Sequence, residues 1–129
     1  MKLWPLPLLL FIISSFSFAK DVVTKKTKGI EFKNLHKPSE TSKIKWQKVI
    51  VGQESIDAAT LIGVDSKSSW RRLGLQSGDV IINLRGKEVH RPRDLNDALS
   101  AIGNDKDESV DLKVLRQDKM ILINYKLQW

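Results

Sequence analysis

The stretch from Ser69 to Val89, SWRRLGLQSGDVIINLRGKEV, carries the signals that decide the fold. Trp70 opens a short helical turn, and Gly74 ends that turn with a left-handed cap. A polar turn then leads into residues 80–84, an apolar run typical of a buried strand. Gly86 permits the positive φ of a tight turn before a short return strand. The stretch therefore predicts a short helix followed by a β-hairpin.

Downstream of this hairpin, the sequence predicts one long helix and two more strands. The helix covers residues 94–102 and has a single apolar stripe. Pro92 suits its first turn, and Gly103 ends it with a left-handed cap. Residues 110–114 and 121–127 alternate apolar and polar side chains, which is typical of strands buried on one face.

Upstream of the short helix, two further strands are expected. Residues 44–51 are rich in β-branched side chains, and Gly52 breaks the run before a second strand over residues 59–64. The order is strand, strand, short helix, strand, strand, long helix, strand, strand. We therefore predict an α+β domain over residues 44–129, a small, partly open antiparallel β-barrel or sandwich capped by one long and one short helix.

This arrangement resembles a bacterial PDZ domain. The motif runs as a short helix, Gly-Leu, two residues, Gly-Asp, an apolar strand and Gly-Lys, and its pairs here are Gly74-Leu75, Gly78-Asp79 and Gly86-Lys87. The resemblance covers about residues 48–128 and extends to two groups, the HtrA-type periplasmic proteases and protein C of type II secretion systems. Trp70 and Leu73 favour the second group, because HtrA-type domains usually have small alanines there. The chain is similar to the PDZ part alone, without a protease domain.

A PDZ domain binds by β-augmentation, in which a partner strand adds to an exposed sheet edge beside a helix. The resemblance implies these candidate peptide-binding residues: Lys48, Val49, Ile50, Val51 and Gly52 on the edge strand and its turn, and Arg91, Leu95 and Leu99 on the helix wall. The nearest equivalent of the loop that cradles a free carboxylate is Val51-Gly52-Gln53, whose third position is polar. Recognition of a free C-terminus and recognition of an internal segment both stay open.

The first residues have the composition of a targeting segment. Lys2 precedes an uncharged, mainly apolar run from Leu3 to Phe18, and Ala19 fits a signal-peptidase site. We predict that residues 1–19 are a signal peptide and that the mature chain is periplasmic or secreted. The alternative is an uncleaved anchor in the inner membrane that faces the periplasm. The lysines that follow the run oppose its translocation.

Residues 20–43 are expected to form a basic, flexible arm. The net charge of the chain is +7, and residues 20–48 contain nine lysines against three acidic residues. Sparse apolar residues with high net charge favour disorder. The arm is either a solvated linker or an electrostatic contact with anionic lipid or a partner. No interleaving of aromatic and basic residues points to nucleic acid.

The side-chain chemistry predicts neither catalysis nor a cofactor. The chain has no cysteine, which excludes disulfides and a thiol nucleophile. His36 and His90 lack partners at metal-ligand spacing, and the acidic run over residues 105–111 lacks the glycine of a calcium loop. Asp79 is expected to be a turn residue that accepts backbone N–H bonds. We therefore predict no enzyme, no metal and no cofactor.

Three functions fit these features. The first is an exported, non-catalytic PDZ module that binds a protein or peptide in secretion or envelope assembly. The second is an adaptor or regulator of an envelope protease of the HtrA type. The third is the regulatory domain of a protease whose catalytic part is encoded elsewhere, and the leader-like segment argues against that fragment.

Overall fold

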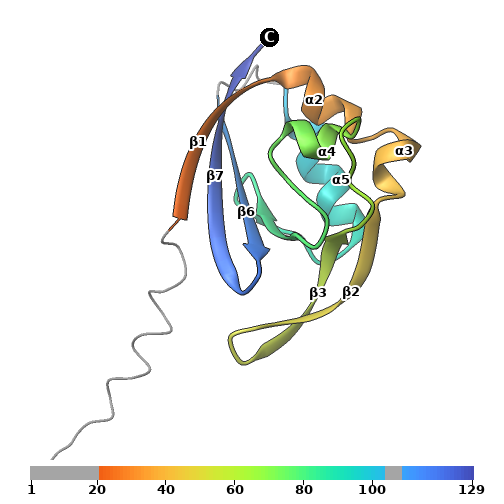
Figure 1. The fold of residues 1–129 in the computed structure, drawn as a ribbon, viewed down its shortest axis with the longest axis vertical. Coiled ribbons are helices and arrows are strands. Elements are labelled where there is room, and N and C mark those ends of the chain that lie inside the picture. The colour runs from red at the N-terminus through yellow and green to blue at the C-terminus, as the bar shows by residue number, and fades with distance from the viewer. Residues whose placement is uncertain (1–20, 104–108) are drawn as a thin grey trace, which may run out of the picture.

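The structure is a computed structural model that describes residues 21–103 and 109–129 (Figure 1). The predicted signal peptide and most of the acidic run lie outside the described residues. The elements in chain order are β1 Asp21–Lys28, α2 Gly29–Asn34, α3 Pro38–Thr41, β2 Ile44–Val51, β3 Glu54–Leu61, α4 Ser69–Arg72, β4 Val80–Leu84, β5 Lys87–Glu88, α5 Pro92–Ala101, β6 Ser109–Arg116 and β7 Lys119–Gln128.

The strands form one open sheet with the order β1-β7-β6-β4-β3-β2, and β5 pairs with β4. All pairs are antiparallel except β1 with β7, which is parallel. The α+β class and the order of elements predicted for residues 44–129 are confirmed, and the sheet is not closed into a barrel. Its two edges, β1 and β2, lie on opposite sides of the molecule (Figure 1).

The core lies between one face of the sheet and the helices α2, α4 and α5. Alternate residues of β7 point into it, because successive side chains of a strand face opposite sides of the sheet. Trp70 of α4 is 2 % exposed and belongs to this core. The long helix presents Leu95, Ala98 and Leu99 to the same core, as its apolar stripe predicts.

Asp79 occupies the turn that leads into β4, as predicted. Its side chain is 1 % exposed and accepts a hydrogen bond from the Gln76 backbone N–H at 3.0 Å. The sequence did not reveal its second partner, Arg116 of β6, whose guanidinium donates to both carboxylate oxygens at 2.9 and 2.7 Å. A bidentate pair of this kind ties the turn to the central sheet.

The predicted flexible arm is wrong for the described residues 21–43, which form β1, α2 and α3. Phe32 and Leu35 are each 1 % exposed, and the Phe32 ring meets the Tyr125 ring edge-on at 5.1 Å between centroids. The two apolar residues lie three apart, hence on one face of a helical turn. A single turn supplies too few apolar positions for a periodic signal, and the residues that bury it are distant in sequence.

Among the described residues, no helix is long and apolar enough to cross a membrane.

Candidate functional site

The β2 strand is a sheet edge with unpaired backbone groups. Within residues 21–103 and 109–129, it pairs only with β3, in the register that places Ile44 opposite Leu61. One residue earlier, the Ile62 N–H donates to the Lys43 carbonyl at 2.7 Å. Hydrogen-bonded and non-hydrogen-bonded pairs alternate along an antiparallel ladder. The backbone groups of Ile44, Trp46, Lys48 and Ile50 therefore point away from β3, toward the open edge.

An apolar groove of about 120 Å³ lies between this edge and α5. Its helix wall consists of Pro92, Leu95, Asn96 and Leu99, and its strand wall of Ile44 and Trp46. The segment between α2 and β2 closes one end with Leu35, His36 and Thr41. Three separate parts of the chain thus converge on a hollow next to free backbone donors and acceptors.

The structure brings together only part of the predicted site. Leu95 and Leu99 line the groove, and at 4 % exposure each also belongs to the core. Arg91 does not line it: its side chain is 68 % exposed and lies 3.7 Å from the Asp94 carboxylate, within the first turn of α5.

The groove lies beside the first half of β2, whereas the predicted residues of this strand belong to its second half. None of the residues from Lys48 to Gly52 lines the groove beside α5. Ile50, Val51 and Gly52 line a different hollow of about 320 Å³, together with Leu115 and Asp118. Gly52 has φ 66° in the turn that joins β2 to β3, so Val51-Gly52-Gln53 is a hairpin turn and not a loop beside the groove. The nearest candidate for a carboxylate-cradling loop therefore lies outside the lining of the groove beside α5.

Besides Pro92 and Asn96 on α5, five lining residues outside that helix were missed from the sequence: Leu35, His36, Thr41, Ile44 and Trp46. The first three belong to the segment predicted as a flexible arm. A usable signal was present at the other two, because an apolar-polar-apolar alternation at residues 44–46 marks the half-buried part of the strand. By contrast, residues 49–51 form an unbroken apolar run that does not indicate which face is buried.

His90 fixes the start of α5 against β3. Its ring Nδ1 lies 3.0 Å from the Asp57 carbonyl, and its Nε2 lies 3.0 Å from the Glu88 carboxylate. The bond to the Asp57 backbone raises the pKa of His90, and the hydrogen bond and charge of Glu88 raise it further. The Asp94 carboxylate accepts the His90 and Arg91 N–H groups at 3.1 and 3.2 Å and so caps the helix. These contacts hold the helix wall of the groove in place.

The groove therefore offers the chemistry of binding. The strand edge supplies backbone hydrogen bonds of the same kind as those within the sheet. The hollow supplies an apolar environment of a size to hold one side chain, since an apolar cavity of about 150 Å³ accepts benzene. Together they suit an extended peptide with a large apolar residue.

Comparison with known proteins agrees with this geometry at the level of the family. A family model described as "PDZ domain" matches residues 29–127. No curated protein matches the chain.

Solved structures to which the chain is similar include the PDZ domain of EpsC from Vibrio cholerae, residues 204–305, with 16 % identity over 75 % of this chain and 90 % of that one, at a TM-score of 0.41. Another is the PDZ domain of pullulanase C protein of the type II secretion system from Klebsiella pneumoniae, in complex with fatty acid. It has 20 % identity over 70 % of this chain and 92 % of that one, at a TM-score of 0.39. Because the family model matches most of the sequence, the chain belongs to the PDZ domain family.

Proposed function

We propose that this protein is an exported binding module that takes up an extended segment of another protein by strand addition to β2. The observation that carries the proposal is the unpaired edge of β2 beside the apolar groove lined by α5. The bound segment forms backbone hydrogen bonds to Ile44, Trp46 and Lys48. One of its apolar side chains enters the groove between Trp46 and Leu95. Backbone bonds give such a complex its affinity, and the pocket gives it selectivity.

The proposed setting is the bacterial envelope, in protein secretion or envelope assembly. It rests on the leader-like residues 1–19 and on the similarity of the Trp70–Leu73 helix to that of secretion-type PDZ domains. Intact-mass measurement of the protein recovered from the periplasm tests the export step. We expect a chain that begins at Lys20, whereas a mass that includes residues 1–19 would show an anchored protein.

Two matched pairs of variants test the groove. Peptides are first selected from a displayed random library on the full chain and are then titrated against each variant. Asn96 and Ser100 are both exposed positions of α5, and only Asn96 lines the groove. Asn96→Trp should fill the hollow and reduce peptide affinity by tenfold or more, while Ser100→Trp should leave it unchanged.

The second pair tests strand addition. The Lys48 N–H faces the open edge, so Lys48→Pro removes a donor to the ligand without removing a bond to β3. Lys48→Ala keeps the donor and loses only the exposed ion pair with Asp57, which contributes about 0–1 kcal/mol. Weaker binding of Lys48→Pro alone, with an unchanged melting temperature, is the expected result. Equal affinity of both variants would mean that no strand adds at this edge.

A further inference from the structure

In the turn that precedes β2, three backbone N–H groups already donate hydrogen bonds within the turn itself. The N–H groups of Thr41, Ser42 and Lys43 donate to the carbonyls of Lys37, Pro38 and Glu40 at 3.0, 3.0 and 3.1 Å. A free C-terminal carboxylate is captured by several backbone N–H groups that converge on it. At the end of the groove where Thr41 contributes to the lining, these three donors are already occupied by the α3 turn.

The backbone conformation there does not form an anion-binding concavity either. Such a nest of N–H groups requires alternation of right-handed and left-handed residues. Among the described residues, every position with a positive φ lies at Gly52 or later in the chain. Gly52 itself belongs to the β2–β3 turn and does not line the groove. The described segment that precedes β2 therefore contains no left-handed residue to build a nest.

The turn is also fixed in this conformation by the core. The Glu40 carboxylate is buried and accepts hydrogen bonds from the Ser68 hydroxyl at 2.6 Å and from the Ser69 N–H at 3.1 Å. The Glu40 carbonyl accepts the indole N–H of Trp70 at 3.0 Å. A rearrangement that frees the N–H groups of residues 41–43 would have to break this buried set of bonds, which makes rearrangement on ligand binding costly.

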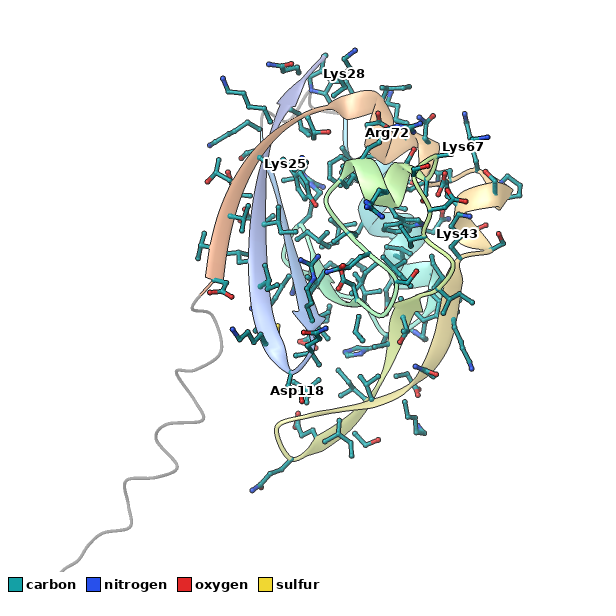
Figure 2. All side chains as sticks on the ribbon, viewed as in Figure 1. Lys25, Lys28, Lys43, Lys67, Arg72 and Asp118 are labelled. Carbon is teal, nitrogen blue, oxygen red and sulfur yellow. The ribbon has the colours of Figure 1, made fainter. Side chains whose placement is uncertain are left out.

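From these contacts we infer that the groove recognises an internal, extended segment through one large apolar residue, and does not read a terminal carboxylate. This inference rests on the proposed function and narrows its ligand class. One cation next to the strand start is Lys43, which lies on the side of the molecule that carries α3 (Figure 2). Its ammonium is a route by which a carboxylate could still bind, so the experiment includes it.

The test uses random dodecapeptides displayed in two ways, one with a free C-terminus and one followed by a constant flanking sequence. Peptides selected on the full chain in either format are synthesised with a C-terminal acid and with a C-terminal amide, and each form is titrated against the wild-type chain, Lys43→Met and Asn96→Trp. We expect both formats to yield ligands, the acid and amide forms to bind within about twofold of each other, and Lys43→Met to bind both forms unchanged.

Two results would overturn the inference while leaving the groove as the binding site. One is a loss of tenfold or more on amidation, a factor that corresponds to about 1.4 kcal/mol. The other is a similar loss in Lys43→Met for the acid form alone. Failure of the proposed function looks different: either neither format yields ligands, or Asn96→Trp binds every selected peptide as well as the wild-type chain does. That result would contradict both the proposed function and the inference that rests on it.

Discussion

At the scale of single residues, Glu40 joins the segment before β2 to the rest of the domain. Its side chain and carbonyl contact Ser68, Ser69 and Trp70, all at the start of α4. Ser68 in turn caps α4, because its hydroxyl accepts the Trp70 N–H at 3.1 Å. One carboxylate thus holds both the end wall of the groove and the first turn of a core helix.

Glu40→Ala should lower the free energy of unfolding by about 1–3 kcal/mol, because it leaves buried donors of α4 without an acceptor. Ser39→Ala, at the exposed neighbouring position, is the matched control and should change little. Urea denaturation of both variants measures the difference. Equal stability of the two variants would show that the buried bonds of Glu40 do not hold the turn.

A second prediction concerns His90 and pH. Because the folded state raises the pKa of His90, protonation of this ring favours the folded protein. Its contribution should be fully present below the unfolded pKa of 6.5 and should be lost as the pH rises through the higher folded pKa. NMR titration should place this pKa above 6.5, and the stability difference between the wild-type chain and His90→Gln should shrink over the same pH range. A folded pKa below 6.5 would contradict the hydrogen bond to Asp57.

At the scale of elements, β1 and α2 are attached in different ways. The side chains of β1 are all partly or fully exposed, and Val22 and Val23 are 60 % and 46 % exposed. This strand is held by its parallel ladder with β7 and buries little apolar surface. The helix α2 contributes Phe32 to the core, and the residue after it, Leu35, is buried as well.

Two truncations should therefore behave differently. A chain that begins at Gly29 should still unfold cooperatively, because the net gain of about 0.5–1.5 kcal/mol per ladder bond is largely offset by the ordering of a backbone that costs about 1–2 kcal/mol per residue. A chain that begins at Lys43 also loses Phe32 and Leu35. Losses of about 2–5 kcal/mol for each such side chain approach the whole stability of a small domain.

Thermal unfolding followed by circular dichroism separates these cases. We expect a cooperative transition for the chain that begins at Gly29 and none for the chain that begins at Lys43. A melting temperature of the Lys43 chain close to that of the full protein would show that residues 29–42 are dispensable for folding.

At the scale of the whole molecule, the sequence predicts the elements that contain their own periodic or turn signals. The Trp70–Gly74 turn, the Gly86 hairpin and the apolar stripe of α5 are local patterns, and the structure has each of them. The position of the groove along β2 is not local. It depends on which half of that strand lies beside α5, which long-range packing decides and at which the alternation of residues 44–46 only hints.

The same reason explains the missed helices. The partners of Phe32 and Glu40 are Tyr125 and the start of α4, which lie far along the chain. The lysine-rich composition of residues 20–43 indicated a flexible arm instead of helices. Most of the lysines in the described part of this segment are exposed, while a few residues between them are buried. Composition averages over a segment, whereas burial is decided residue by residue.

The central claim is that the open edge of β2 accepts a ligand strand. Backbone hydrogen exchange of Trp46 and Lys48, measured with and without a selected peptide, tests it most directly, because their N–H groups face the open edge in the free protein. Strand addition predicts that both amides gain protection on binding, together with chemical-shift changes along α5. Protection confined to the β6–β7 hairpin, whose tip carries Asp118 (Figure 2), with unchanged exchange at Trp46 and Lys48, would contradict the claim.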